Sequence, residues 1–500
     1  MADICLLVEG AYPYVTGGVS SWIQALITHM PDFSFSVQYI GTNPDPHRKP
    51  RYRFPENMVE FREIFLHDTS RLHSLHQAKH PAETWQAFHQ LHEAIALGTM
   101  HNANQLRSLL RQPNFAQLTL ADLFYARESW DLLEGIYQEY AADQSFMDFF
   151  WTFRLTYLPI FSIFEASLPQ ASVYHAVSTG FSGLLGSLAR LRNGSPFLIT
   201  EHGLYTRERE IEIMQSAWIY RPALSHHIDR QRLGFFQQWW LNIFRFMEEI
   251  SYDTADSILS ITNVNQQYQL KRGANPDKMQ LISNGVDIQR FAGLRKHQPV
   301  TTDHFQVGFV GRIVPIKDVK TLIRALKIAS LSIPHLDAYL VGPTDEDPHY
   351  FQEVQQIINL LDLTNVVHFT GSVDVRTYYG QLDVIVLTSL SEGQPLVIME
   401  ANAAGVPVIA TDVGACRELL QGISPEDQAF GPSGLITPVT SPQATAEAII
   451  QLWRDQDLRL RMGRAGEERT RRFYRQEQLY SAYRELYHQT ISRARSGKAW

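Results

Sequence analysis

The stretch LDVIVLTSLSEGQPLVIMEANAAGVPVIATD (382–412) decides the fold. It starts and ends with apolar runs, VIVLTS and VPVIATD, that are typical of buried strands. The segment between them predicts a helix over about 395–404. Pro395 suits its first position, where a missing N–H loses no partner, and Gly405 suits the left-handed conformation that ends helices. A strand, a helix and a strand in this order predict a parallel sheet.

The same alternation predicts two doubly wound α/β domains. The first series has expected strands at 4–10, 35–41, 171–180, 196–203, 257–262 and 279–287, with a helix at 17–30 and a long aromatic helix at about 228–252. The second series has expected strands at 305–312, 337–343, 365–371, 382–389, 406–412 and 434–438. Its expected helices are 318–331, 349–362, 374–381, 395–404, 415–421 and 441–453, followed by a helical tail over 456–495.

Two segments interrupt this rhythm. Residues 65–170 are rich in His, Leu, Trp and Phe and nearly lack glycine, so they predict a mostly helical insertion. The polar stretch 291–304 predicts a linker. We therefore expect an N-terminal Rossmann-like domain over 1–295, a C-terminal one over 296–475, and a helix over 476–500 that packs back on the first domain. Ligands of such sheets bind at the carboxyl ends of the strands, so we expect a central cleft between the domains to hold the site.

Composition excludes several classes of protein. The formal net charge is -8, with 44 Lys and Arg against 52 Asp and Glu, which argues against nucleic acid as a partner. Only two cysteines occur, so neither a disulfide framework nor a cysteine zinc site is expected. Histidines at 67, 73, 76, 80, 89 and 92 are too loosely spaced to predict a metal site. No apolar stretch reaches the roughly 18–20 residues of a spanning helix, and a cytoplasmic protein is expected.

Two glutamates in the deciding stretch are candidate ligand contacts. Glu392 lies in the loop after the strand, and Glu400 lies about one and a half turns into an otherwise apolar helix. A carboxylate in such a place needs hydrogen-bond donors, and ribose or sugar hydroxyls would serve. Either glutamate alone would be interpreted as a solvated charge.

Two glycine-containing loops predict phosphate contacts. GFVGRIVPIKD (308–318) ends a strand and brings the cations Arg312 and Lys317 toward one helix start, which is typical of a diphosphate site. Gly17 and Gly18 open the first helix and permit close approach of the backbone. The full G-x-G-x-x-G pattern is absent there, which disfavours a nicotinamide dinucleotide.

Together GGVS, EHG, SNGVD, VGR-x4-K and E-G-x-P-L-V-x-x-E-A resemble the retaining GT-B glycosyltransferases of glycosyltransferase family four, over about 1–45 and 170–475. EHGLYTREREIEI (201–213) and the helical insertion narrow the resemblance to the glycosyltransferases of bacterial Pel exopolysaccharide synthesis. The resemblance implies transfer of a hexosyl unit from a UDP-sugar, UDP-glucose first, to a saccharide acceptor. It implies no cofactor, no metal, and inner-membrane Pel synthase components as partners, which would hold the chain at the membrane periphery.

The resemblance also implies roles for individual residues. Arg312 and Lys317 would grip the donor diphosphate, Glu400 the ribose, and Glu392 the donor sugar, while His175 would face the reacting sugar. The remaining implied contacts to donor or acceptor are Gly17, Gly18, Glu201, His202, Asn284, Gly311, Gly371, Val373, Gly393, Gln394, Pro395 and Leu396.

Alternatives stay open at this point. The donor could be a UDP-N-acetylhexosamine, and the chain could be a nucleotide-sugar-binding scaffold without turnover. A sugar-nucleotide epimerase or a phosphorylase would also use such a fold. A pyridoxal phosphate phosphorylase would need a lysine that forms a Schiff base with the cofactor, and no clear candidate for this lysine is found. Retention is compatible with front-face attack and with a carboxylate nucleophile. The carboxylates of DED (345–347) resemble a metal motif but are interpreted as a solvated loop.

Overall fold

The computed structural model describes residues 1–68, 79–96, 103–110, 112, 118–215, 233–294 and 304–496. The chain forms two compact units. Unit 1 comprises Met1–Ser260, Gln266–Leu281 and Tyr483–Trp500, and unit 2 comprises Ile261–Asn265 and Ile282–Ala482. The predicted domain boundary at 295/296 and most of the predicted linker lie outside the described residues, as does the predicted start of the aromatic helix at 228.

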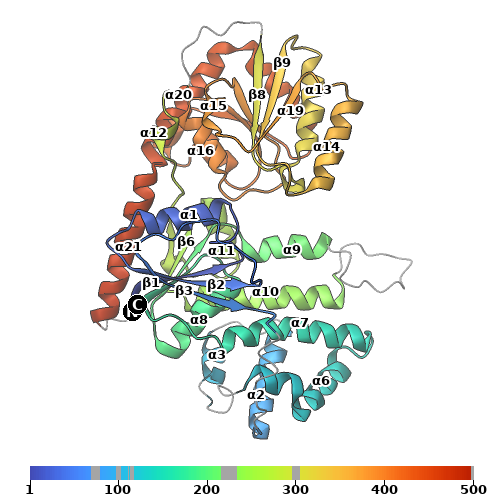
Figure 1. Ribbon diagram of the computed structural model, residues 1–500, viewed down its shortest axis with the longest axis vertical. Coiled ribbons are helices and arrows are strands. Elements are labelled where there is room, and N and C mark those ends of the chain that lie inside the picture. The colour runs from blue at the N-terminus through green and yellow to red at the C-terminus, as the bar shows by residue number, and fades with distance from the viewer. Residues whose placement is uncertain are drawn as a thin grey trace. The chain divides into compact units, whose positions relative to one another are not determined.

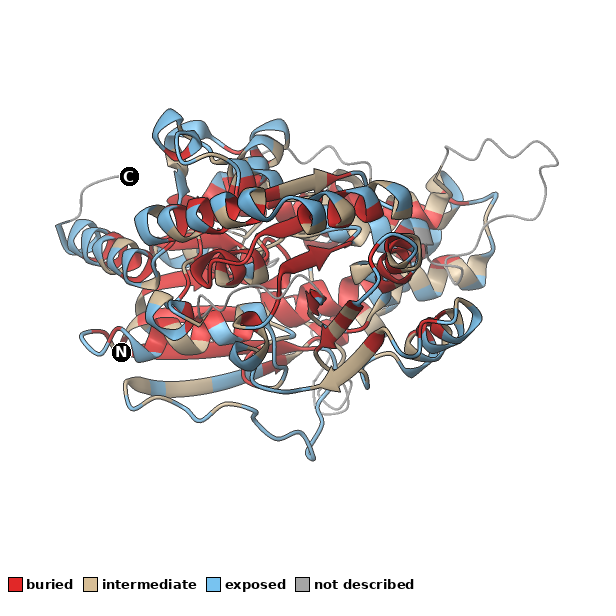
Figure 2. Ribbon diagram, turned by 90° about the horizontal axis from the view of Figure 1, so that it is seen from above, coloured by how far each residue is buried: buried red, intermediate tan, exposed pale blue. Residues whose placement is uncertain are grey.

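Among the described residues, unit 1 contains a parallel sheet of seven strands in the order β3-β2-β1-β4-β5-β6-β7 (Figure 1). The strands are β1 (Ala2–Glu9), β2 (Phe35–Gly41), β3 (Met58–Phe65), β4 (Ala171–Ala176), β5 (Phe197–Glu201), β6 (Ser257–Ser260) and β7 (Met279–Leu281). The six strands expected from sequence are confirmed. The central strands are buried (Figure 2), which is why they read as apolar runs.

Strand β3 was not predicted. It lies at the edge of the sheet, where only β2 pairs with it, and most of its residues are exposed or half-buried. Glu60, Arg62 and Glu63 give it a polar character, because charged side chains are tolerated and even favoured on an edge strand. A search for continuous apolar runs in the sequence therefore does not detect β3.

Helices of unit 1 cover the sheet and form the insertion. Those of the sheet layers are α1 (Gly18–Thr28), α8 (Phe181–Asn193), α9 (Tyr205–Gln215), α10 (Phe235–Thr254) and α11 (Asn263–Lys271). Those of the insertion are α2 (Ala82–Ala96), α3 (Ala103–Leu110), α5 (Leu120–Tyr125), α6 (Arg127–Tyr140) and α7 (Phe146–Phe164). In Figure 1, α2, α6 and α7 gather below α10, and α2 and α7 contact α10. The insertion shares one continuous apolar core with the sheet layers.

Unit 2 has its own parallel sheet, of six strands in the order β10-β9-β8-β11-β12-β13 among the described residues. The strands are β8 (Phe305–Val310), β9 (Leu336–Val341), β10 (Val367–Gly371), β11 (Val384–Leu387), β12 (Val408–Thr411) and β13 (Gly434–Thr437). Strand order reverses between β8 and β11, so the chain leaves their carboxyl ends in opposite directions. Ligand sites of doubly wound sheets form at such a reversal.

The helices of unit 2 agree with the predicted segments, apart from the short α12 and α18, which were not predicted. They are α12 (Ile288–Phe291), α13 (Val319–Ser330), α14 (Pro348–Leu360), α15 (Arg376–Tyr379), α16 (Leu396–Ala403), α17 (Cys416–Gln421), α18 (Pro425–Gln428), α19 (Pro442–Arg454) and α20 (Gln456–Phe473). Helix α21 (Gln476–Ser496) follows, and its residues from Tyr483 onward belong to unit 1. None of the helices in the described ranges is both long and apolar enough to cross a membrane.

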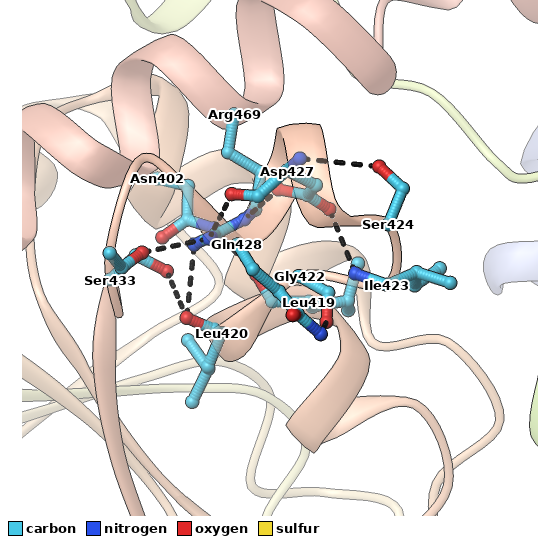
Figure 3. A network of polar contacts seen from close by, with 11 residues as sticks. Asn402, Leu419, Leu420, Gly422, Ile423, Ser424, Asp427, Gln428, Ser433 and Arg469 are labelled. Carbon is cyan, nitrogen blue, oxygen red and sulfur yellow. Dashed lines mark hydrogen bonds and ion pairs between the residues drawn. The ribbon is translucent and has the colours of Figure 1, made fainter.

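A buried ion pair fixes α20 inside unit 2 (Figure 3). Arg469 is fully buried, and its Nε donates to Oδ1 of Asp427 at 2.5 Å. Its Nη1 donates to the carbonyl of Leu420 at 2.9 Å, and its Nη2 donates to the carbonyls of Asp427 and Gly431 at 3.1 and 2.8 Å. The guanidinium therefore replaces its lost hydration with a complete set of protein acceptors.

Candidate active site

The deciding stretch folds as predicted, with one shift. Strand β11 leads through a loop into α16, and Pro395 is the N-cap of α16 rather than its first residue. The end of α16 is a Schellman motif: Gly405 has φ +72°, its N–H bonds the carbonyl of Asn402 at 3.0 Å, and the N–H of Val406 bonds the carbonyl of Ala401 at 2.9 Å.

Lys317 is held at the carboxyl edge of the sheet by its own backbone. It ends a short 3-10 turn after β8, and Asp318 then takes a left-handed conformation (φ +43°) and caps α13 through Thr321. The hydroxyl of Thr388, just past β11, donates to the carbonyls of Lys317 and Asp318 at 3.1 and 2.9 Å. The loops after β8 and β11 are thereby fixed to each other.

The side chain of Lys317 meets Glu392. Lys317 Nζ lies 2.6 Å from Glu392 Oε1, and the hydroxyl of Ser389 donates to the same oxygen at 2.5 Å. The two charged side chains retain only 21% and 10% of their exposure, so the pair is stronger than an ion pair on the open surface. The sequence placed both residues in the site but did not predict this pairing, nor the role of Ser389.

Arg312 is placed at the same strand end and has its own carboxylate partner. Its Nη1 donates to Glu346 Oε2 at 2.7 Å, and both side chains are about half exposed. Asp347 caps α14 by accepting from the N–H of Tyr350 at 2.9 Å. The prediction of a solvated loop at DED (345–347) is confirmed for Asp345 and Glu346, which are exposed, whereas Asp347 is half-buried and caps α14. Gly311 lies against β9: a Cβ built on Gly342 would lie 2.0 Å from the carbonyl oxygen of Gly311.

Glu400 lies on α16 and accepts a hydrogen bond from the hydroxyl of Tyr379, whose oxygen is 2.9 Å from Glu400 Oε2. Burial raises the pKa of Glu400 above its ordinary value, and the Tyr379 bond and the charge of Arg290 oppose this rise. Among the described residues, the hydroxyl of Tyr379 is the group that donates a hydrogen bond to the Glu400 carboxylate. The sequence reasoning missed Tyr379, and no local signal identifies it.

The loop before α16 contacts the segment that follows β7. Gln394 Oε1 accepts from the N–H of Asn284 at 2.8 Å, and its Nε2 donates to the hydroxyl of Ser283 at 2.5 Å. The side-chain oxygen of Asn284 is buried without a hydrogen-bond partner. The carbonyl of Gly393 accepts from the N–H of Ala415 at 2.9 Å. The three predicted contacts Asn284, Gly393 and Gln394 are thus part of one hydrogen-bonded framework within unit 2.

Three further predicted contacts of unit 2 lie at strand or helix ends. Gly371 ends β10 with φ +68°, a conformation that favours glycine. Val373 follows it with 43% exposure, and Leu396 begins α16 with 36% exposure. These two apolar side chains, one after β10 and one at the start of α16, are exposed enough to contact a ligand.

Gly17 and Gly18 lie at the start of α1, as predicted. Both are exposed, and a Cβ built on either would meet no atom within 4 Å. Contacts within unit 1 therefore do not require glycine at these two positions. Their small size is compatible with a ligand that approaches the backbone.

His175 is a buried residue of β4 in unit 1. Its Nδ1 lies 2.7 Å from the hydroxyl of Tyr487, and its Nε2 lies 2.8 Å from the hydroxyl of Thr200. Burial, aided by the nearby His202, lowers the pKa of His175 to about 3, so the ring is neutral near pH 7. Both nitrogens have partners within unit 1, as expected of a structural histidine. Its role at the reacting sugar stays a prediction.

Glu201 and His202 follow each other at the end of β5. Glu201 is fully buried and accepts from the side chains of Thr179, Tyr252 and Gln269 at 2.9, 2.6 and 2.7 Å. Its carboxylate is thus satisfied within unit 1. The ring of His202 lies 4.5 Å from that of Trp22, and His202 Nε2 and Trp22 Nε1 are buried without hydrogen-bond partners. His202 is therefore the better candidate for a ligand contact.

Two histidines of the insertion, His80 and His92, contact other side chains through their ring nitrogens. His80 Nε2 lies 2.9 Å from Asp122 Oδ2, and His92 Nδ1 lies 2.6 Å from the hydroxyl of Tyr157. His73 and His76 lie outside the described residues. In the part of the chain that the structure describes, no group of three or more His, Cys, Asp or Glu side chains is arranged to hold a metal ion.

Similar sequences divide the chain as the sheets do. Residues 2–277 match a family described as a domain of unknown function, DUF3492, and residues 292–469 match glycosyl transferases group 1. A D-inositol 3-phosphate glycosyltransferase from Saccharomonospora viridis is 30% identical over 241 residues, which cover 45% of this chain and 54% of the relative. An N-acetyl-alpha-D-glucosaminyl L-malate synthase from Bacillus anthracis is 25% identical over 268 residues, which cover 51% and 65%. The chain spans about half the length of the first of these relatives.

Solved structures show the fold. Sucrose-phosphate synthase from Thermosynechococcus elongatus aligns with a TM-score of 0.60 at 18% identity, over 98% of this chain and 99% of that chain. Anabaena HepE in complex with UDP-glucose aligns with a TM-score of 0.58 at 14% identity, over 98% and 100%. Each unit is a Rossmann-like domain of the GT-B type. Most of the second unit matches the glycosyl transferases group 1 model, and the chain belongs to the DUF3492 family.

Proposed function

We propose that this chain is a retaining glycosyltransferase that moves a hexosyl unit from a UDP-sugar to a saccharide acceptor. One observation carries the proposal: Lys317 and Glu392, from the loops after β8 and β11, form a partly buried pair where the strand order reverses. A fixed cation beside an acid at that edge suits a nucleotide sugar, which presents a diphosphate and hydroxyls together. Arg312 adds a second cation after β8.

In this proposal the cations stabilise the leaving group. As the bond between the anomeric carbon and the diphosphate oxygen breaks, negative charge grows on the diphosphate, and Lys317 and Arg312 offset it. Each cation then exchanges its carboxylate partner, Glu392 or Glu346, for phosphate oxygens. Glu392 is released to accept from the donor sugar, and Glu400 accepts from the ribose hydroxyls.

The bond changes balance without a further reagent. The acceptor hydroxyl oxygen bonds to the anomeric carbon from the face that the diphosphate leaves, and its proton passes to the diphosphate. This front-face course explains retention. A double displacement through a carboxylate nucleophile is the alternative course. His175, Glu201 and His202 stay predictions for the acceptor side.

UDP-glucose is the proposed donor, and the proposed setting is bacterial Pel exopolysaccharide synthesis with inner-membrane synthase components as partners. The structure of HepE contains UDP-glucose, which is compatible with this donor. A UDP-N-acetylhexosamine is the second candidate, because one relative is named N-acetyl-alpha-D-glucosaminyl L-malate synthase. A scaffold without turnover is disfavoured, since Arg312, Lys317, Glu392 and Glu400 are all present.

A donor comparison tests the proposal. We expect the purified chain to release UDP from UDP-glucose at a rate above those from UDP-N-acetylglucosamine, ADP-glucose and GDP-glucose, measured by quantifying the free nucleotide. The rate should persist in EDTA, because Arg312 and Lys317 supply the positive charge that a divalent ion supplies in other transferases. No release from any donor would contradict the proposed activity, and strict dependence on an added metal would contradict the role of the cations.

A further inference from the structure

Unit 1 contains a cavity of about 630 Å³ that the proposed reaction does not use. It lies between α10 and the helical insertion, lined on one side by a stripe of α10 and on the other by residues of α2 and the end of α6. In Figure 1 these helices lie together on the side of unit 1 that carries the insertion. The volume falls within the range of small-molecule sites in proteins.

Part of the cavity lining is aromatic. Phe235, Trp239 and Tyr140 form this part. Trp239 is held by its Nε1, which donates to the hydroxyl of Thr156 at 3.3 Å, and by the ring of Phe149, whose centroid is 5.6 Å away. Trp239 itself is only 4% exposed, so the half-buried rings of Phe235 and Tyr140 offer most of the flat surface on which the C–H face of a ring can pack.

The lining also contains charged side chains, those of Arg245, Arg272 and Glu249, and both arginines have carboxylate partners. Arg272 Nε donates to Glu248 at 2.8 Å, and Arg245 Nη2 lies 3.5 Å from Glu210. Because each arginine has an acid beside it, the cavity does not demand a ligand of net charge. Gln238 and Asn242 line the cavity as well. Gln238 Nε2 donates to the side-chain oxygen of Asn242 at 2.7 Å, which leaves the side-chain oxygen of Gln238 as an acceptor.

We propose that this cavity binds an oligosaccharide of about two or three rings, the size that its volume admits. Hydroxyl groups both donate and accept, so they match the guanidinium, amide and carboxylate groups of Arg245, Gln238 and Glu249. Sugar rings also carry apolar C–H faces, which match the aromatic rings of the lining. The choice of a saccharide rests on the proposed function, and the cavity then holds a part of the acceptor or product chain away from the reacting sugar.

Calorimetric titration of the full chain with chitotriose, cellotriose and maltotriose tests this assignment, without any donor present. We expect at least one of these trisaccharides to bind. Ala94 lines the cavity on α2, so Ala94→Phe fills the space without removing a contact and should weaken binding about tenfold or more. Gln238→Leu, which removes a polar partner, is a second variant. Ala142→Phe, at an exposed position of the insertion, is the matched control and should bind as the natural chain does.

Two results would overturn the assignment: no trisaccharide binds at millimolar concentration, or Ala94→Phe and Gln238→Leu, folded by circular dichroism, bind as tightly as the Ala142→Phe control. The donor comparison separates this inference from the proposed function. A chain that binds a trisaccharide through the cavity but releases no nucleotide contradicts the transferase activity and supports the cavity as a saccharide site.

Discussion

Replacing Lys317 by alanine is expected to lower the transfer rate by about a hundred- to a thousand-fold, the cost of removing one fixed group that stabilises charge in a transition state. Lys317 Nζ is held 2.6 Å from Glu392, and the hydroxyl of Thr388 fixes its backbone, so no neighbouring cation can take the same position. The measurement is kcat with saturating UDP-glucose. The fold should persist, because Ser389 still donates to Glu392.

Lys320→Ala is the matched control for this experiment. Lys320 lies on α13 in the same unit, is paired with Glu353 at 2.7 Å, and has a side-chain exposure of 25% against 21% for Lys317. Its loss removes a comparable ion pair without touching the loop after β8, so the rate should stay close to that of the natural chain. Equal transfer rates for the two folded variants would contradict the assignment of Lys317 as a contact of the donor diphosphate.

Arg469→Ala is expected to have the largest effect on stability, a loss of about 3–5 kcal/mol in the free energy of unfolding. The substitution leaves Asp427, which is 3% exposed, as a buried carboxylate without its cation (Figure 3). It also removes the donor to the carbonyls of Leu420 and Gly431. Urea unfolding followed by circular dichroism, with the transition of unit 2 fitted by itself, measures the change.

Arg472→Ala on the same helix provides the comparison. Arg472 pairs with Glu426 at 3.1 Å, but both side chains are about 60% exposed, so water replaces the lost partner at little cost. Its expected effect is within about 1 kcal/mol. If the two arginine variants unfold at the same urea concentration, the buried network of Arg469 contributes no more than a surface ion pair, contrary to this account.

Much of the fold could be predicted because parallel strands buried on both faces leave a clear signal. The run VIVLTS and the helix that Gly405 ends were located to within two residues. The edge strand β3 left no such signal, since Glu60, Arg62 and Glu63 interrupt its apolar residues. The helix was predicted to begin at Pro395, one residue before α16 begins, because proline suits both the N-cap and the first turn of a helix.

The places of the candidate site residues in the fold could be predicted, but their partners could not. Arg312, Lys317, Glu392 and Glu400 were found from their place after strands or on a helix. The pairing of Lys317 with Glu392 joins residues 75 positions apart and depends on β8 and β11 being neighbours in the sheet. The two hydroxyls that contact His175 belong to Thr200 and Tyr487, 25 and 312 positions away, and nothing near His175 in the sequence indicates them.

The most direct measurement of the central claim is a crystal structure of the chain with UDP-glucose. The account predicts the diphosphate within hydrogen-bonding distance of Arg312 and Lys317, the ribose hydroxyls at Glu400, and the hexose hydroxyls at Glu392, with the Lys317–Glu392 pair opened. A diphosphate bound elsewhere, with Lys317 still paired to Glu392, would contradict it.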